Sequence, residues 1–147
     1  MNSTDRPATE SNIDAEAEYL FVYGTLRRDS GSAMHDLLAK HAQPVGKGVY
    51  RGRLYRIDWY PGAVPSDDPD ETVHGEIYLM QHPELILPQL DRYEETGPDF
   101  PEPHEYVRRR QPVRLLSGEC LSAWIYLYNR PVDSLMRISS GDFLRER

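Results

Sequence analysis

A glutamate near the end of a predicted helix is the side chain best suited to proton transfer in this sequence. Glu94 belongs to the run QLDRYEE after Pro88, which predicts about two helical turns. Leu90 lies four residues before Glu94, so both face the same side of that helix. If this side is partly buried, desolvation raises the pKa of the Glu94 carboxyl toward neutrality and makes it a usable acid and base. The alternative is an ordinary glutamate on a solvated helix surface.

Other catalytic chemistries have little support in the sequence. The five histidines, at positions 35, 41, 74, 82 and 104, show neither the spacing of zinc ligands nor companion cysteines. Cys120 starts an apolar strand, which favours a buried structural thiol over a nucleophile. The chain contains no G-x-S-x-G elbow, phosphate-binding glycine loop or dinucleotide fingerprint. Carboxylate chemistry is therefore the remaining candidate.

The turn after the first predicted strand is a second feature that could contact a ligand. Residues 19–22 are aromatic, aliphatic and β-branched, which predicts a strand, and Gly24 ends it. A glycine at this point allows a sharp turn that presents consecutive backbone N–H groups. Thr25 adds a hydroxyl, and Arg27 and Arg28 add positive charge at the rim. An ordinary strand-to-loop turn is the alternative interpretation.

The rest of the chain reads as short strands with a few helices. Further strands are expected at residues 45–58, 72–80, 105–116 and 120–128. Helices are expected at 33–41, where Ser32 can cap the first turn, after Pro83 and Pro88, and near 132–138. A turn at 60–62 and a polar loop at 65–70 interrupt the strands, and three prolines stiffen the loop at 98–103.

These elements predict an α+β fold. The strands follow one another too closely for a parallel, doubly wound sheet, which needs long crossovers. Glycines 46, 48 and 52 within one strand pattern indicate bulges and strong coiling. We therefore expect a small mixed β-barrel of five to six strands with about three peripheral helices.

Composition limits the class of protein further. At 147 residues the chain fits one domain with a core that needs no disulfide or metal. Residues 1–18 are acidic and nearly without apolar side chains, so we expect a disordered tail before a single domain at residues 19–147. No secretory signal and no run of about 20 apolar residues occur. With one cysteine, these features predict a soluble, cytoplasmic protein without a membrane partner.

The charge of the chain argues against a nucleic-acid partner. The formal net charge is −7, whereas phosphate backbones bind basic surfaces. Arg108, Arg109 and Arg110 are consecutive, so in a strand they point to alternate faces and form no continuous patch. We expect a solvated strand edge there, because charged side chains protect an edge from pairing with other chains.

A series of motifs, in this order, resembles the gamma-glutamylcyclotransferase-like superfamily, and in particular its gamma-glutamylamine cyclotransferase, or AIG2-like, branch. The motifs are YGTL at 23–26, GRLYRIDWYPG at 52–62, VHGEIY at 73–78, LDRYEE at 90–95, EYVRR at 105–109 and AWIYLY at 123–128. Residues 19–128 carry the resemblance, and ISSGDF at 138–143 extends it.

The resemblance implies a closed barrel with a substrate pocket at one end. By its place three residues after Asp91 in L-D-x-x-E, Glu94 is the expected catalytic acid and base. The residues expected to bind substrate are Tyr23, Gly24, Thr25, Leu26, Tyr106 and Tyr128. The partner is a small γ-glutamyl compound, no metal or cofactor is needed, and no oligomeric state is predicted.

The implied reaction, of the transferase or lyase type, is an intramolecular cyclisation. The substrate α-amine attacks the γ-carbonyl, forms the five-membered ring of 5-oxoproline and expels an amine or amino acid. Glu94 accepts the amine proton and returns it to the leaving nitrogen. Backbone N–H groups of residues 24–26 hold either the substrate carboxylate or the oxyanion.

Two positions depart from the family pattern. Glu95 stands where a glycine is usual, and a second carboxylate is expected to raise the pKa of Glu94. Residues 98–103 are an insertion that lengthens the segment between Glu94 and Tyr106. A catalytically silent barrel that binds a γ-glutamyl or other amino-acid-like ligand is therefore an alternative. A third is an interaction module that uses an exposed aromatic surface.

Overall fold

The computed structural model describes residues 18–24 and 33–146. The elements in this part of the chain are β2 (Glu18–Val22), α2 (Ala33–His41), β3 (Ala42–Arg56), β4 (Pro61–Pro65), β5 (Thr72–Met80), α3 (Pro83–Tyr93), β6 (Tyr106–Leu115), β7 (Cys120–Tyr128), β8 (Met136–Arg137) and α4 (Phe143–Glu146). The tail expected at residues 1–18 lies outside the described residues except for Glu18, which begins β2. Ser32, expected as a helix cap, also lies outside them.

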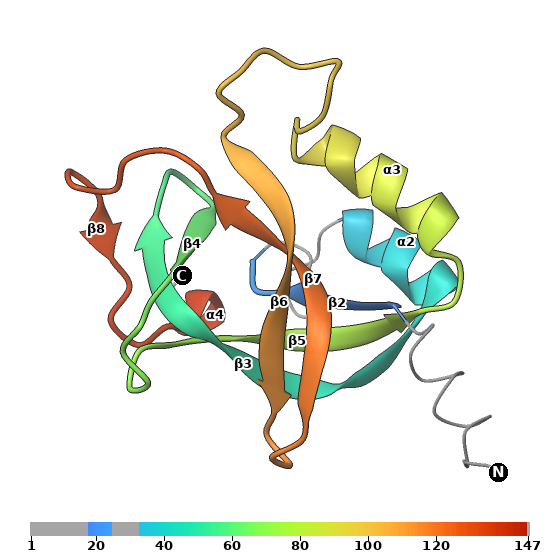
Figure 1. Ribbon diagram of the computed structural model, residues 1–147, viewed down its shortest axis with the longest axis horizontal. Coiled ribbons are helices and arrows are strands. Elements are labelled where there is room, and N and C mark those ends of the chain that lie inside the picture. The colour runs from blue at the N-terminus through green and yellow to red at the C-terminus, as the bar shows by residue number, and fades with distance from the viewer. Residues whose placement is uncertain (1–17, 25–32, 147) are drawn as a thin grey trace, which may run out of the picture.

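Five strands close into a barrel in the order β3, β5, β2, β7, β6 and back to β3 (Figure 1). Only β2 and β7 pair in parallel; the other neighbours within the barrel are antiparallel. Two further strands, β4 and β8, pair with the far end of β3. The predicted α+β fold with a small mixed barrel and three helices is confirmed.

The long strand β3 closes the barrel, and glycine makes the closure possible. Its register with β5 shifts between Pro44 and Gly46, which is a bulge of the kind expected from the glycines. Gly48 pairs with Leu115 of β6 at the seam. A Cβ atom at Gly48 would lie 2.7 Å from the carbonyl oxygen of Arg114, so any other residue would push β6 away.

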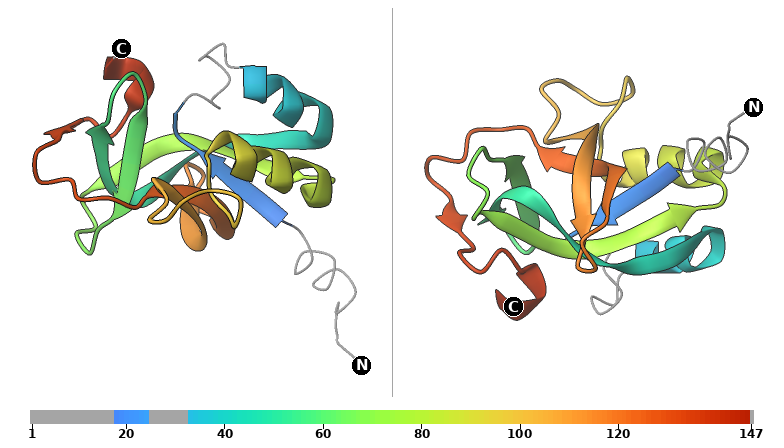
Figure 2. Two further views of the ribbon diagram at one scale, coloured as in Figure 1. Left: turned by 90° about the horizontal axis from the view of Figure 1, so that it is seen from above. Right: turned by 60° about the horizontal axis from the view of Figure 1, so that its bottom comes forward.

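Two apolar clusters share the strands between them. Phe21 of β2 belongs to the cluster inside the barrel, and Leu20 and Val22 belong to a second cluster outside it. Successive side chains of a strand point to opposite faces, so β2 is buried on both. The second cluster includes Leu38 of α2 and Leu90 of α3. Figure 2 shows α2 and α3 together on one side of the barrel and α4 at the other end, beside β3 and β4.

Most predicted elements are confirmed, with boundaries within a few residues. The strands at 72–80 and 120–128 and the helix at 33–41 have the expected bounds. The two helix starts at Pro83 and Pro88 belong to one helix, α3. Pro88 is tolerated because its missing N–H would have bonded the carbonyl of Glu84, an exposed residue in the first turn where water can replace that bond.

Two local predictions are wrong because tertiary pairing overrides the local pattern. The helix expected near residues 132–138 is a turn followed by β8, since Met136 and Arg137 pair with the open edge of β3. The turn expected at 60–62 closes earlier, and Pro61 already begins β4. In both cases a segment pairs as a strand with β3 beyond the closed barrel, and no local sequence pattern predicts this pairing.

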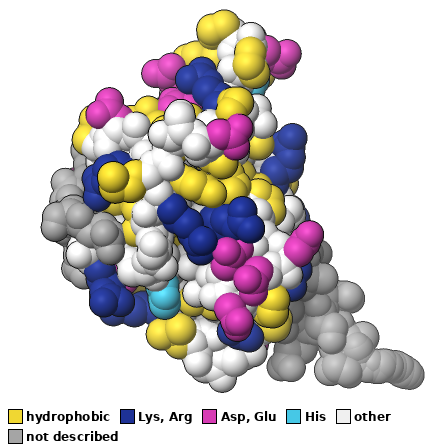
Figure 3. All heavy atoms as spheres, turned by 90° about the vertical axis from the view of Figure 1, so that its left-hand side faces the viewer, with side chains coloured by type: hydrophobic (Ala, Val, Ile, Leu, Met, Phe, Trp, Pro, Cys, Tyr) yellow, Lys and Arg dark blue, Asp and Glu magenta, His cyan; other side chains and the backbone are white. Residues whose placement is uncertain are grey.

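Charges on the described surface are mixed in sign. Basic and acidic side chains are interspersed on the face shown in Figure 3. Arg108 and Arg109 point to opposite faces of β6 as expected, but Arg108 forms an ion pair with Asp91 instead of being fully solvated. None of the three described helices combines the length and the apolar character that a membrane span requires.

Candidate active site

A cavity of about 230 Å³ opens where four parts of the fold meet. These parts are the end of β2, the segment that leads into β4, the end of α3 and the start of β6, with β7 behind them. The lining residues are Phe21, Val22, Tyr23, Gly24, Trp59, Tyr60, Pro61, Tyr93, Glu94, Glu95, Glu105, Tyr106 and Tyr126. Gly24 and Glu94, seventy residues apart in the sequence, therefore share one cavity.

The end of α3 fixes the position of Glu94. Glu94 is the C-cap, and its N–H still donates to the carbonyl of Leu90 at 2.8 Å. The N–H of Glu95 donates to Arg92 at 3.1 Å, and the N–H of Thr96 donates to Asp91 at 2.9 Å. This pair of bonds, with Glu95 at a φ of 56°, is a Schellman motif, which stops the helix at Glu94.

Burial makes Glu94 a candidate proton carrier. Desolvation raises the pKa of its carboxyl to about 7, and the nearby charge of Glu105 adds to the shift. The adjacent Glu95, expected to supply that charge, is exposed, and Glu105 supplies it instead. Within the described part of the chain, no group donates a hydrogen bond to the Glu94 carboxylate. Because Glu94 lines the cavity, its carboxyl combines a position beside a possible ligand with a pKa near neutral pH.

Buried tyrosine hydroxyls brace the walls of the cavity. The Tyr23 hydroxyl donates to the carbonyl of Tyr126 at 2.6 Å and accepts the N–H of Ala63 at 3.1 Å. The Tyr106 hydroxyl donates to the carbonyl of Pro61 at 2.5 Å. Burial raises the pKa of both phenols, so neither is a base near neutral pH. The hydrogen bonds of Tyr23 connect the end of β2 to β4 and β7, and the hydrogen bond of Tyr106 connects β6 to β4. The Tyr106 oxygen can still accept a hydrogen bond.

An ion pair docks the last turn of α3 onto the barrel. Arg108 of β6 donates to both carboxylate oxygens of Asp91, from Nε at 2.8 Å and from one terminal nitrogen at 3.0 Å. The hydroxyl of Tyr126, a cavity residue on β7, donates to the same carboxylate at 2.6 Å. The guanidinium of Arg108 also lies 4.6 Å from the centre of the Trp124 ring. Asp91 thus links α3 to two strands, one turn before Glu94.

The rim of the cavity is aromatic and acidic. The Tyr60 hydroxyl donates to Glu105 Oε2 at 2.6 Å. Trp59 packs edge-on against Tyr60, with ring centres 5.1 Å apart, and 65% of its surface is exposed. Sequence reasoning did not single out Trp59, Tyr60, Glu105 or Tyr126, although each lies within a motif quoted above. Their spacing along the chain does not indicate that these residues lie close together in the fold.

Of the residues expected to bind substrate, three line the cavity: Tyr23, Gly24 and Tyr106. A Cβ atom at Gly24 would lie 3.0 Å from the Pro61 side chain, so glycine permits a close approach there. Tyr128 is absent from the lining and packs against the Tyr106 ring, with centres 5.6 Å apart. Thr25 and Leu26 lie outside the described residues. So do Arg27 and Arg28.

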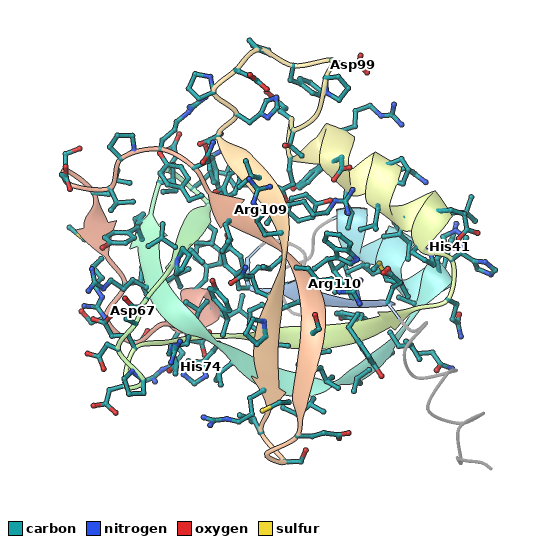
Figure 4. The ribbon with its side chains drawn as sticks, viewed as in Figure 1. His41, Asp67, His74, Asp99, Arg109 and Arg110 are labelled. Atoms are coloured by element: carbon teal, nitrogen blue, oxygen red, sulfur yellow. The ribbon has the colours of Figure 1, made fainter. Side chains whose placement is uncertain are left out.

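Two other expectations from the sequence concern residues away from the cavity. Cys120 is exposed, so the prediction of a buried thiol is wrong, because its strand begins at a solvent-facing hairpin. The histidines are spread over the molecule: Figure 4 shows His41 beside the helices and His74 on the opposite side. Residues 18–24 and 33–146 contain no group of three or more His, Cys, Asp or Glu side chains that are placed to hold a metal ion.

Comparison with known proteins gives one consistent result. A family model described as "Gamma-glutamyl cyclotransferase, AIG2-like" matches residues 20–145. The Escherichia coli K12 protein named gamma-glutamylcyclotransferase family protein YtfP is 37% identical over 126 residues, which cover 85% of this chain and 95% of that relative. The solution structure of ytfP from Escherichia coli matches with a TM-score of 0.59 at 36% identity, covering 88% of this chain and 99% of that one.

Two further solved structures share the fold. YkqA from Bacillus subtilis matches with a TM-score of 0.65 at 28% identity, and the match covers 86% of this chain but only 39% of YkqA. An AIG2-like protein from Mus musculus matches with a TM-score of 0.62 at 25% identity, covering 78% of this chain and 80% of that one. The barrel with its peripheral helices is therefore common to bacterial and mammalian relatives.

Proposed function

The chain belongs to the gamma-glutamyl cyclotransferase, AIG2-like family, and from this premise we propose that it is an enzyme that converts γ-glutamyl compounds into 5-oxoproline. Membership confirms the resemblance drawn from the sequence motifs. The reaction and the residues that perform it remain our proposal. The observation that supports it best is the partly buried Glu94 carboxyl, which lines the same cavity as Gly24 and has a pKa raised to about 7.

The chemistry needs a proton carrier and a fixed substrate conformation. The α-nitrogen of the substrate forms a bond to the γ-carbonyl carbon, and the amide bond to the leaving nitrogen breaks. Because the nucleophile belongs to the substrate, holding the folded conformer supplies much of the rate enhancement. A group with a pKa near 7 can both accept the ammonium proton and return it to the leaving amine.

Three groups have roles in this proposal, and of their residues Thr25 and Leu26 lie outside the described part of the chain. Glu94 carries the proton from the α-ammonium to the leaving nitrogen. Backbone N–H groups of residues 24–26 hold the substrate carboxylate or the oxyanion of the tetrahedral intermediate. The Tyr106 oxygen, whose own proton is donated to Pro61, can accept a hydrogen bond from the α-ammonium. No step requires a metal or a cofactor.

The test is release of 5-oxoproline from γ-glutamyl amines, γ-glutamyl dipeptides and glutathione by the purified protein and by Glu94→Gln. We expect kcat to fall by about a hundredfold or more in the variant, because general acid–base catalysis contributes about that much. Glu119→Gln, which changes an exposed carboxylate at the β6–β7 hairpin, serves as the control. Full activity in Glu94→Gln would refute the assignment of Glu94.

A non-catalytic barrel that binds the same ligands is the second candidate. It would bind γ-glutamyl compounds without releasing 5-oxoproline, so binding affinity could be measured but turnover could not. Calorimetric titration of both proteins with the same panel separates the two functions. Lost turnover with preserved affinity in Glu94→Gln would assign a chemical role to the carboxylate.

A further inference from the structure

The last turn of α3 carries Glu94 into the cavity, although two features of this turn favour its opening. Burial raises the pKa of the Glu94 carboxyl, so the charged form gains hydration when the turn moves toward solvent. Glu95 lies in the left-handed region at a φ of 56°, which costs energy in a residue with a Cβ atom. Apolar packing does not secure the turn, because burial ends at Leu90 and both Arg92 and Tyr93 are exposed. A polar contact is therefore needed to hold the turn against the barrel.

Asp91 makes this polar contact. Its Oδ1 atom accepts hydrogen bonds from Arg108 Nε at 2.8 Å and from the Tyr126 hydroxyl at 2.6 Å, and its Oδ2 atom accepts one from a terminal nitrogen of Arg108 at 3.0 Å. Arg108 and Tyr126 are directly paired across β6 and β7, so their side chains lie side by side on one face of the barrel. A carboxylate in the last turn of a helix faces the negative end of the helix dipole, so Asp91 does not stabilise α3 by itself. Its contribution is the contact with the barrel.

Tyr126 extends this contact to the opposite wall of the cavity. Its main-chain carbonyl accepts the Tyr23 hydroxyl at 2.6 Å, and Tyr23 directly precedes Gly24. The Tyr126 side chain itself lines the cavity. A chain of short hydrogen bonds therefore runs from Asp91, one turn before Glu94, to the residue before Gly24. This chain sets the distance between the two walls.

We propose that Asp91 is a positioning residue, which acts through Arg108 and Tyr126 to keep the Glu94 carboxyl in the cavity opposite the turn after β2. This inference rests on the proposed function and adds to it the residues that position the proton carrier. Asp91 is absent from the cavity lining, so it acts through Glu94 and not by touching the substrate. Its effect is large because a displacement of about 1 Å in a reacting group costs about a hundredfold in rate.

The first test compares kcat and KM for one γ-glutamyl amide in the wild type, Tyr126→Phe and Asp91→Asn. Tyr126→Phe removes one hydrogen bond to Asp91, and we expect kcat to fall by about tenfold while KM changes less than about threefold. Such a split arises because Glu94 acts in the chemical step, whereas the turn after β2 binds the substrate. Asp91→Asn also disrupts the bonds from Arg108 and should cost more. A loss confined to KM would overturn the proposal.

A double variant tests whether the two residues act together. Because Asp91 and Tyr126 belong to one hydrogen-bond network, the loss of kcat in Asp91→Asn/Tyr126→Phe should be smaller than the product of the two single losses. Losses that multiply would show independent effects and overturn the proposal. Tyr126→Phe keeps the ion pair of Asp91 with Arg108, so it decides the test where Asp91→Asn does not fold.

The pKa of Glu94 separates positioning from a general loss of stability. Carbon-13 NMR follows the titration of its carboxyl, which is assigned by the absence of its signal in Glu94→Gln. From about 7 in the wild type, we expect the pKa to move toward the ordinary value of 4.5 in Tyr126→Phe, because the carboxyl becomes hydrated. A variant that is only less stable would lose folded protein and keep the pKa. An unchanged pKa in Tyr126→Phe would overturn the proposal.

The change in pKa reports the position of Glu94 because Tyr126→Phe alters no charge. Burial raises the pKa of the Tyr126 phenol, which is therefore neutral near pH 7. The other titratable groups of the cavity lining are the same in both proteins: Tyr23, Tyr60, Tyr93, Glu95, Glu105 and Tyr106. Asp91→Asn removes a negative charge and lowers the pKa of Glu94 for that reason as well, so Tyr126→Phe is the deciding variant.

Arg110→Gln is the matched control. Arg110 lies two residues after Arg108 on the same face of β6, but it pairs with Glu18 of β2 at 2.9 Å instead of with α3. We expect Arg110→Gln to leave both kcat and the pKa of Glu94 unchanged. Losses in this control equal to those in Tyr126→Phe would overturn a specific role of the contact with α3.

The outcomes separate this inference from the proposed function. If the wild type releases 5-oxoproline and Tyr126→Phe matches it in kcat and in the pKa of Glu94, the enzyme activity stands and the inference fails. If the wild type releases no 5-oxoproline, the proposed function fails. The NMR titration needs no turnover, so it still shows whether the contact of Asp91 holds Glu94 in the cavity.

Discussion

At the scale of single residues, the burial of Glu94 raises the pKa of its carboxyl and lowers the stability of the folded chain at high pH. Its carboxyl has a pKa of about 7 in the folded chain, against an ordinary value of 4.5. The folded state therefore holds the proton more tightly than the unfolded state does. The protonated Glu94 carboxyl therefore contributes about 3 kcal/mol to the free energy of unfolding. This contribution is fully present below pH 4.5 and is lost as the pH rises through 7.

This linkage predicts a stabilised variant. Glu94→Gln removes the buried charge, so at about pH 8 we expect its free energy of unfolding to exceed that of the wild type by about 2–3 kcal/mol. At about pH 4 the two proteins should be equally stable, because the glutamate is protonated there in both states. Urea unfolding at both pH values measures the difference. A gap that is independent of pH would show that Glu94 is solvated.

At the scale of elements, the end of α3 carries a strained residue. Glu95 adopts a φ of 56°, which is the left-handed conformation that glycine adopts without a steric penalty. The Schellman turn requires that conformation, which gives a physical reason for the glycine that the family resemblance implies at this position. In this chain the turn is kept although the glycine is absent.

Replacing Glu95 should relieve that strain. We expect Glu95→Gly to raise the free energy of unfolding by about 1 kcal/mol, because glycine enters the left-handed region freely. Glu95→Ala keeps the Cβ atom and should show no comparable gain, which makes it the matched control. Thermal unfolding of the three proteins at one pH gives the comparison. Equal gains in both variants would mean that charge, not backbone strain, is the cause.

The docking of α3 depends on one carboxylate. Asp91 receives the paired hydrogen bonds of Arg108 and the hydroxyl of Tyr126, and both partners are largely shielded from solvent. Asp91→Asn leaves Arg108 without its counter-charge, so we expect a loss of about 1–3 kcal/mol in denaturant unfolding. Arg110→Gln, which breaks a more exposed pair with Glu18, should cost less than about 1 kcal/mol. Equal losses would contradict a special role of Asp91.

At the scale of the whole molecule, the single thiol lies far from the cavity. Cys120 begins β7 at the hairpin with β6, whereas Tyr126 lines the cavity six residues further along the same strand, about 20 Å away. We expect one equivalent of a maleimide reagent to label the native protein without changing 5-oxoproline release. Mass spectrometry of the folded protein checks the stoichiometry. A thiol that reacts only after denaturation would contradict its exposure.

The barrel explains why the opening strand is so apolar. Phe21 faces the interior of the barrel, and Leu20 and Val22 face the helices, so no face of β2 is free for polar side chains. The same arrangement places the chain after β2 directly at the cavity. A strand buried on both sides also gives the site a rigid wall.

The sequence by itself determined the elements with strong local patterns, the fold class and the family. Alternation identified β5 and an aromatic, apolar run identified β7, both with their observed bounds, and the spacing of Leu90 and Glu94 placed a carboxylate on the buried side of α3. These features depend on residues close in the chain, where periodicity and turn chemistry act directly.

Only the tertiary structure decided which distant residues meet. Tyr126, Glu105 and Trp59 lie on three separate segments, and nothing in their sequence neighbourhood indicates that they surround Glu94. The same holds for β8, which forms where an open edge of β3 accepts it, and for Cys120, whose exposure depends on the hairpin at the barrel end. Barrel closure sets these contacts, because it brings together side chains whose separation along the chain is too large for any local pattern to encode.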